Sequence, residues 1–223
     1  MQIVPTLLEK NPEGFIRQFN KLSPYYRYFQ IDIADGKFVP NKTLTVSEVL
    51  LAIQQLNNLA IKQCVFDFHL MVDDYKNELE TIKKISALIP VKHILVHVST
   101  IHDSSFPPTS YPFSFGLVLD PQDLVDDVSK RFDLNTFPAI QIMSVSPGFQ
   151  GSPFLKETIS KVEQLRSKHY RNLILVDGAM RDATISYVLS QKFMHDVICV
   201  GSYLTLEEDP KGHIAQLRKL ITE

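Results

Sequence analysis

The sequence lacks the features that mark a membrane-bound or nucleic-acid-binding protein. No apolar run approaches the ~20 residues of a membrane-spanning helix, so we expect no transmembrane segment. The formal net charge is only −2, with no basic excess and no block of like charges, which argues against a nucleic-acid partner. The N-terminal segment also lacks the charged-then-apolar layout of a signal peptide. We therefore expect a cytoplasmic protein without membrane or nucleic-acid partners.

Cysteine is equally scarce. The chain has two cysteines, Cys64 and Cys199, each within an apolar run typical of a strand. Two cysteines can form a disulfide or share a metal, but cysteines in such runs are more typical of free thiols in a reducing compartment. The pattern predicts that both thiols are buried and unpaired.

Hydrophobic periodicity predicts strands that alternate with helices along the whole chain. Short apolar runs indicate strands at residues 2–7, 28–33, 63–68, 93–97, 113–119, 139–143, 173–176 and 196–200. Amphipathic segments indicate helices at residues 13–22, 46–56, 76–87, 155–167, 182–191 and 210–222. This alternation is typical of parallel βαβ units, and eight right-handed units can close into a barrel. We predict an α/β protein with a single TIM (β/α)8 barrel domain over residues 1–223. Residues 100–111 are too rich in Pro, Ser and Thr for a full helix, so we expect a loop or a single turn there.

Polar or glycine-rich groups stand at the C-terminal ends of most predicted strands, where such barrels carry their working residues. In chain order these ends are Thr6, Asp32, His69, His97, Asp120, Met143, Asp177 and Gly201–Ser202. Packing alone does not explain so many polar ends. We therefore expect a ligand site at this end of the barrel.

A cluster of metal-ligating residue types is predicted at this end. Gln30 and Asp32 lie on one face of a strand, and burying two polar side chains costs free energy unless a partner satisfies them. Taken singly, a strand-end Asp often caps the next helix and a lone His often belongs to the core. Jointly, Asp32, His69 and Asp177 could hold one divalent cation such as Zn, Fe(II), Mn or Co. The cation would act as a Lewis acid on a carbonyl oxygen while the carboxylates move a proton.

Glycine-rich turns after the last three strands predict a phosphate site. Gly148 and Gly151 allow a close backbone approach to a ligand in the loop after the sixth strand. Gly178–Ala179 and Gly201–Ser202 follow the seventh and eighth strands, where TIM barrels commonly bind phosphate. Each glycine alone is more often a plain turn, whereas three clusters together favour a phosphate site.

Several motifs in this order resemble the ribulose-phosphate 3-epimerase family over nearly the whole chain. They are IDIADGKFVPN at 31–41, DFHLMV at 67–72, MSVSPGFQG at 143–151, VDG at 176–178 and GS at 201–202. The resemblance implies a TIM barrel that interconverts ribulose 5-phosphate and xylulose 5-phosphate with one bound divalent metal. It implies that Asp32 and Asp177 are the acid/base pair and metal ligands, with His69 a third ligand that also contacts substrate. It further places around the substrate Thr6, Gly148, Phe149, Gln150, Gly151, Gly178, Ala179, Gly201 and Ser202.

The chain departs from the family pattern at several of these positions. Gln30 stands where the family has a fourth ligand, His; an amide oxygen can coordinate, but it is a weaker and harder ligand than imidazole. Other departures from the usual residue are Thr6 for Ser, Ala34 for Met, Gln150 and Ala179 for Gly, and Ser152 for Gln. Two alternatives follow: a barrel that binds a sugar phosphate without turning it over, and an epimerase for another ketose phosphate such as a hexulose 6-phosphate. A homo-oligomer is left open.

Overall fold

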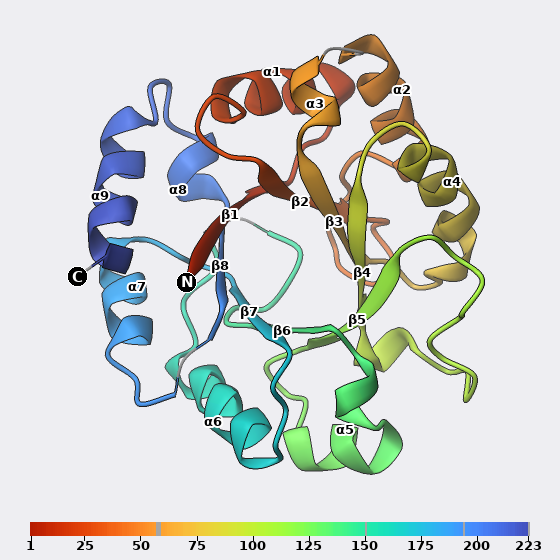
Figure 1. The fold of residues 1–223 in the computed structure, drawn as a ribbon, viewed down its shortest axis with the longest axis vertical. Coiled ribbons are helices and arrows are strands. Elements are labelled where there is room, and N and C mark those ends of the chain that lie inside the picture. Colours follow the sequence, from red (N-terminus) through yellow and green to blue (C-terminus); the bar gives the residue numbers. More distant parts are fainter. Residues whose placement is uncertain (57–58, 150, 194, 223) are drawn as a thin grey trace.

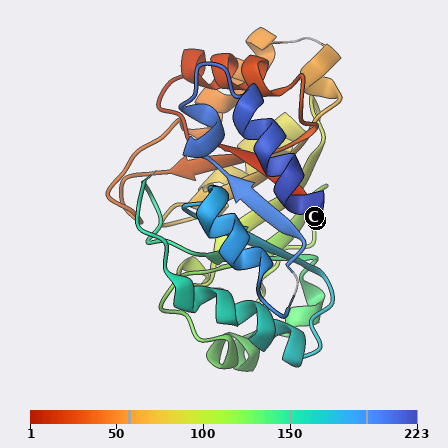
Figure 2. The same ribbon diagram turned by 90° about the vertical axis from the view of Figure 1, so that its left-hand side faces the viewer.

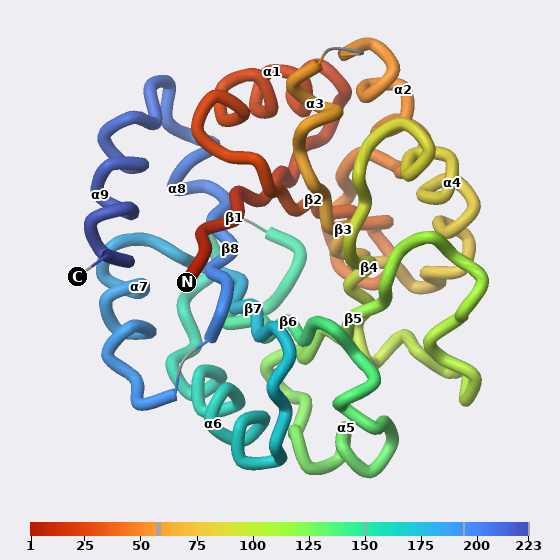
Figure 3. The backbone as a smooth tube through the Cα atoms, viewed as in Figure 1, coloured from red at the N-terminus to blue at the C-terminus, as the bar shows by residue number. Residues whose placement is uncertain are grey.

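The protein is an eight-stranded parallel β-barrel surrounded by helices (Figure 1). The computed structural model describes residues 1–223 except 57–58, 150, 194 and 223. Its strands are β1 (Gln2–Leu7), β2 (Tyr28–Ala34), β3 (Val65–Met71), β4 (Val91–His97), β5 (Ser114–Leu119), β6 (Ala139–Met143), β7 (Leu173–Asp177) and β8 (Val197–Val200). Each strand pairs with the next along the chain, and β8 pairs with β1, so the chain circles the barrel once (Figure 3). The predicted TIM barrel is confirmed.

Helices on the outside connect most of the strands. The α-helices are α1 (Pro12–Leu22), α2 (Val46–Leu56), α3 (Leu59–Lys62), α4 (Lys76–Ser86), α5 (Val125–Arg131), α6 (Ser160–Ser167), α7 (Asp182–Leu189), α8 (Ser202–Thr205) and α9 (Lys211–Thr222). Single 3-10 turns are η1 (Val98–Thr100), η2 (Leu134–Thr136) and η3 (Lys156–Ile159). The sequence did not predict α3, α5 and α8, which are too short to show a clear helical period. Within the described part of the chain, none of the helices is long and apolar enough to span a membrane.

Strand β3 extends further than expected. The apolar run indicated residues 63–68, whereas β3 runs over Val65–Met71 and includes His69. The strand continues because Phe68 and Leu70 still pack in the outer core, while His69 faces the barrel interior. Asp32 likewise lies inside β2, so strands rather than loops fix both side chains.

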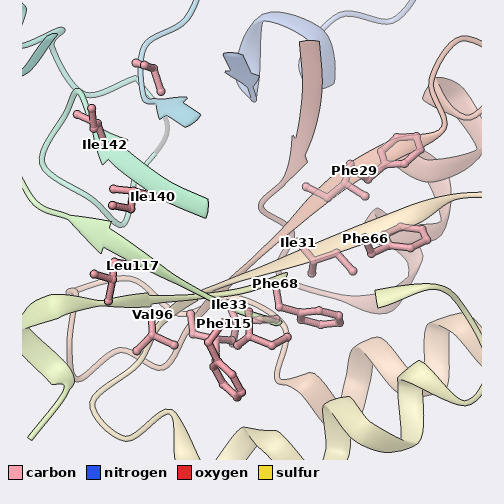
Figure 4. Close-up of a cluster of buried hydrophobic side chains, with 14 of the residues drawn as sticks. Phe29, Ile31, Ile33, Phe66, Phe68, Val96, Phe115, Leu117, Ile140 and Ile142 are labelled. Carbon is pink, nitrogen blue, oxygen red and sulfur yellow. The ribbon is translucent and has the colours of Figure 1, made fainter. Parts of the chain in front are cut away.

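The main core lies between the barrel and its helices. Alternate strand side chains such as Phe29, Phe66 and Ile140 point away from the barrel axis and pack in this layer (Figure 4). The rings of Phe19 on α1, Phe29 and Phe66 lie 5.5–6.2 Å apart between centroids. Residues 101–113, all described, form neither helix nor strand, as expected for a Pro-rich link.

The barrel interior is lined by the remaining strand residues and holds both apolar and polar groups. Val4, Leu95, Val118 and Leu175 belong to an apolar interior cluster that also includes Cys199. Both cysteines are buried and free, as predicted. Toward the N-terminal ends of the strands, Tyr28, Asp67 and His93 form a buried hydrogen-bonded group. The interior therefore has polar groups at both ends, and those at the C-terminal end form the site described next.

Two loops meet above the C-terminal ends of the strands. The loops after β2 and after β6 project from the same side of the barrel (Figure 2). Asn41 Nδ2 donates to the Gly148 carbonyl oxygen at 2.5 Å. Gly148 has a φ of +109°, and a Cβ there would lie 2.7 Å from Val39 Cβ, so only glycine permits this approach. The two loops thus form one rim.

Candidate active site

Two carboxylates and one imidazole converge inside the C-terminal end of the barrel. Asp32 on β2, His69 on β3 and Asp177 on β7 each offer one ligand atom, and these atoms lie within 4.8 Å of one another. His69 Nδ1 is 3.2 Å from Asp32 Oδ1 and 3.8 Å from Asp177 Oδ2. The pairing of Asp32 with His69 across β2 and β3 brings the two side chains together on the interior face. The sequence placed these three residues at one end of the barrel, and they do meet there.

The electrostatics of the cluster favour a positive charge between the carboxylates. Burial, with the charge of nearby Asp32, raises the pKa of Asp177 to about 7. Burial works to lower the pKa of His69, but the hydrogen bond to Asp32 and the charges of both carboxylates outweigh it and raise that pKa. Two buried carboxylates and an imidazole are the ligand types that zinc and iron(II) accept. The donor set therefore fits a divalent cation.

Gln30 lies beneath this cluster and is fully buried. Its Nε2 donates to Asp32 Oδ1 at 2.9 Å and to Asp177 Oδ2 at 2.7 Å. Its Oε1 faces Cys199 Sγ at 3.5 Å. The amide thus ties the two carboxylates together and turns its oxygen away from them. The predicted ligand role of Gln30 requires the amide to rotate, and it stays a prediction.

A second buried amide contacts the same carboxylate. Gln141 on β6 is fully buried, and its Nε2 donates to Asp177 Oδ2 at 3.0 Å. Gln141 was not among the site residues predicted from the sequence. The available signal was its place between the outward-facing Ile140 and Ile142, which puts a polar side chain into the interior.

His97 and Asp120 extend the cluster away from the pocket. His69 Nε2 is 2.9 Å from His97 Nε2, and His97 Nδ1 is 3.0 Å from Asp120 Oδ2. All three side chains are buried. Burial lowers the pKa of His97 in spite of the Asp120 carboxylate. Both residues stood among the polar strand ends in the sequence, which assigned them no role.

One pocket opens over the cluster and contains most of the residues predicted for the site. Those lining it are Thr6, Asp32, His69, Gly148, Phe149, Gly151, Asp177, Gly178, Ala179, Gly201 and Ser202. Gln30 lies below the pocket floor, and Gln150 lies outside the described residues. Further lining residues are Leu8, Met71, Met143, Val145, Pro147, Ser152, Met180 and Cys199. The pocket joins the acid pair to the glycine-rich turns.

In the turn after β7, both Gly178 and Ala179 have a positive φ. Gly178 has a φ of +117°, and a Cβ there would lie 2.6 Å from Val145 Cγ2. Ala179 has a φ of +52°, in the left-handed region that costs a residue with a Cβ roughly 1–2 kcal/mol. Ala179 therefore adopts a backbone conformation that glycine takes without this cost.

The barrel, the buried acid pair and the glycine-lined pocket at the C-terminal strand ends together define a TIM-barrel enzyme. The model of the family described as "Ribulose-phosphate 3 epimerase family" matches residues 2–205, and the chain belongs to this family. Family membership places the chain among the isomerases, with the epimerases that act on carbohydrates.

Relatives with that name cover most of the chain. Ribulose-phosphate 3-epimerase of Helicobacter pylori (strain J99 / ATCC 700824) is 28% identical over 99% of this chain and 98% of its own length. The cytoplasmic isoform from Oryza sativa subsp. japonica is 29% identical over 87% of this chain and 82% of its own length. The resemblance stated from the motifs is thereby confirmed.

Solved structures show the same fold at low identity. KGPDC from Streptococcus mutans superposes with a TM-score of 0.66 at 13% identity, covering 99% of this chain and 96% of that one. 3-Hexulose-6-phosphate synthase from Salmonella typhimurium gives 0.62 at 12%, covering 100% and 98%. At such identities the likeness shows the barrel fold alone.

Proposed function

We propose that the protein is a metal-dependent ribulose-phosphate 3-epimerase. It would interconvert D-ribulose 5-phosphate and D-xylulose 5-phosphate by two-base proton transfer at C3. The observation that carries this proposal is the pair Asp32 and Asp177, buried on non-adjacent strands and both facing one pocket. The family and the names of the relatives support it. The rice relative's description as a cytoplasmic isoform supports a cytoplasmic location.

Asp32, His69 and Asp177 would hold the divalent metal, with Gln30 as the predicted fourth ligand after rotation of its amide. When bound, the cation stabilises the negative charge that develops on the substrate's carbonyl oxygen as the neighbouring C–H proton leaves. Zn, Fe(II), Mn and Co all suit carboxylate and imidazole ligands. The chain's own carboxylates then have the task of moving the proton.

Inversion at C3 needs one carboxylate to take a proton and another acid to return one. One carboxylate removes the C3 proton, and the electron pair moves into the C2–C3 bond while charge passes to the C2 oxygen. The other group, in its acid form, donates a proton to the opposite face of C3, so no atoms are gained or lost. In the metal-free site, burial raises the pKa of Asp177 to about 7, so this carboxyl holds a proton more readily than an exposed aspartate does. The two residues exchange roles in the reverse reaction.

The remaining predicted contacts would bind the substrate. We assign Thr6, His69, Gly148, Phe149, Gln150, Gly151, Gly178, Ala179, Gly201 and Ser202 to substrate binding. All of the described ones line the pocket, which supports the assignment. The backbone N–H groups after β7 and β8 suit a phosphate group, because they offer donors without bulky side chains.

Replacement of the acid Asp177 by an amide tests the proton transfer. Asp177→Asn should slow exchange of the C3 proton with deuterated solvent by at least about 100-fold for one of the two epimers, ribulose 5-phosphate or xylulose 5-phosphate, because an amide cannot act as acid or base. The measurement is NMR of the substrate's C3 proton, with circular dichroism to confirm the fold. Asp127→Asn is the control, since Asp127 is an exposed partner of Lys130 and should leave exchange unchanged. Exchange at the wild-type rate from both epimers in Asp177→Asn would remove Asp177 from the acid/base role.

The orientation of Gln30 favours one alternative, a barrel that binds a sugar phosphate without turnover. With its amide oxygen turned from the carboxylates, the site has three ligands instead of four. Metal content and ribulose 5-phosphate turnover, measured on one sample purified without chelator, separate this alternative from the epimerase.

The second alternative, an epimerase for a hexulose 6-phosphate, depends on free space beside Ala34. Val39 and Met71 cluster with that residue. Comparing pentulose and hexulose phosphates as substrates tests it.

A further inference from the structure

Outside the pocket, Asp120 and His97 form a buried row that ends on His69. We propose that Asp120 and His97 are positioning residues that keep the His69 hydrogen on Nε2, so that Nδ1 presents a lone pair toward Asp32 and Asp177. The inference rests on the proposed function, because it concerns the nitrogen with which His69 would bind the metal.

The two imidazoles meet edge to edge. Their Nε2 atoms are 2.9 Å apart, while the ring centroids are 5.0 Å apart and the planes are tilted by only 26°. The nitrogens are therefore much closer than the ring centres, which is the geometry of a hydrogen bond and not of a stack. His69 and His97 are 1% and 0% exposed, so solvent does not compete for these atoms. One ring must donate and the other must accept.

Asp120 decides which ring donates. An ionised carboxylate only accepts, so His97 Nδ1, 3.0 Å from Asp120 Oδ2, carries a hydrogen. A neutral His97 then has a bare Nε2, which accepts from His69 Nε2–H. His69 Nδ1 is left facing the two carboxylates.

The opposite pattern does not fit these contacts. If a neutral His97 carried its hydrogen on Nε2, its bare Nδ1 would face Asp120 Oδ2 at 3.0 Å, and two acceptors would meet with no hydrogen between them.

Asp120 and His97 are held firmly enough to act this way. The Asp120 backbone N–H donates to Asp123 Oδ2 at 2.8 Å. The buried Lys161 donates from Nζ to the Asp120 carbonyl and, at 2.9 Å, to the Pro121 carbonyl. The Phe38 ring packs against His97 with centroids 4.6 Å apart. These contacts hold the Asp120 backbone and the His97 ring without using the atoms that form the hydrogen bonds of the row. Metal-binding histidines in proteins are commonly oriented by such outer partners.

The first experiment reads the hydrogen positions in the unaltered protein. Long-range ¹H–¹⁵N NMR on the metal-free wild type, at a pH alkaline enough to neutralise the rings, should place the His69 hydrogen on Nε2 and the His97 hydrogen on Nδ1. A His69 hydrogen on Nδ1 overturns the inference. This measurement needs neither metal nor turnover, so its outcome does not depend on the proposed function.

Two substitutions of His97 then test the consequence. In His97→Gln, a carbonyl can accept from His69 Nε2–H while the NH2 group donates to Asp120; His97→Leu offers neither. By competition with a chelator, Co²⁺ should bind His97→Leu roughly 10–100-fold more weakly than wild type, and His97→Gln should recover most of the loss. Circular dichroism confirms that both variants fold. Equal weakness in the two variants, or full affinity in His97→Leu, overturns the inference. A wild type that binds no Co²⁺ would instead count against the proposed metal, with the NMR result standing by itself.

Discussion

At the scale of single residues, Gln30 has the most consequence for the site. Its Nε2 donates to both members of the acid pair, at 2.9 and 2.7 Å. Amide donors stabilise a buried carboxylate, but each is a neutral dipole and offsets less charge than an imidazolium or a metal ion. Gln30 therefore keeps the two carboxylates oriented while contributing little positive charge.

Gln30→His should tighten metal binding. An imidazole at this position adds a nitrogen ligand beside Asp32 and Asp177, and we expect Zn²⁺ or Co²⁺ affinity to rise by at least roughly the 10–100-fold typical of outer-shell changes. Chelator competition measures it. Gln30→Met is the matched control, because it removes the amide donors without supplying an imidazole. An unchanged affinity, or an equal gain in both variants, would mean that residue 30 is not a ligand position.

At the scale of elements, strand β5 packs tightly against its two neighbouring strands at Gly116. A Cβ there would lie 2.7 Å from the Ala139 carbonyl oxygen on β6 and 2.7 Å from Leu95 Cδ2 on β4. The backbone oxygen belongs to the neighbouring strand and cannot move without disturbing the sheet. Glycine at this position lets β5 and β6 keep their register beside the site.

Gly116→Ala should therefore destabilise the barrel by about 1–3 kcal/mol, the usual cost of overpacking a tight interior. Urea denaturation measures the change in the free energy of unfolding. Gly212→Ala on helix α9 provides the contrast, because a Cβ there meets nothing within 4 Å and should leave stability equal or slightly higher. Equal effects of the two substitutions would contradict the prediction, because they would show that β5 and β6 accommodate the added methyl group.

At the scale of the whole molecule, a buried histidine links stability to pH. His195 precedes β8, is 3% exposed, and its Nε2 has no hydrogen-bond partner among the described residues. Burial lowers its pKa to about 4, against about 6.5 for an exposed histidine. Below pH ~6.5 the unfolded chain takes up a proton that the folded protein resists, so stability falls as the pH drops toward 4.

His195→Phe should remove this part of the acid sensitivity. The free energy of unfolding of the wild type should fall about 2–3 kcal/mol more than that of the variant between about pH 7 and pH 4.5. Comparing the two proteins cancels other titrations, including that of Asp177, whose raised pKa acts in the opposite direction. His102→Gln on the exposed loop serves as control. Identical pH slopes in wild type and His195→Phe would contradict the prediction.

The sequence by itself determined the barrel and the positions of most of the site. Alternation of strand and helix periods is a local property, and it predicted eight strands that the structure confirms. The rule that working residues stand at C-terminal strand ends then placed Asp32, His69 and Asp177 together. The motifs identified the family without reference to any distance. The local pattern was enough to predict the barrel, because the crossover between two parallel strands is almost always right-handed.

The partners of those residues were decided only by the tertiary structure. The orientation of the Gln30 amide joins β2 to the non-adjacent strand β7. The contact of Gln141 with Asp177 and the row through His97 join neighbouring strands, at positions set by the register between them. Which interior side chains touch depends on the register between strands and on how the closed barrel brings non-adjacent strands face to face. A period of two fixes which face a residue lies on, but it carries no information about the residue across the barrel.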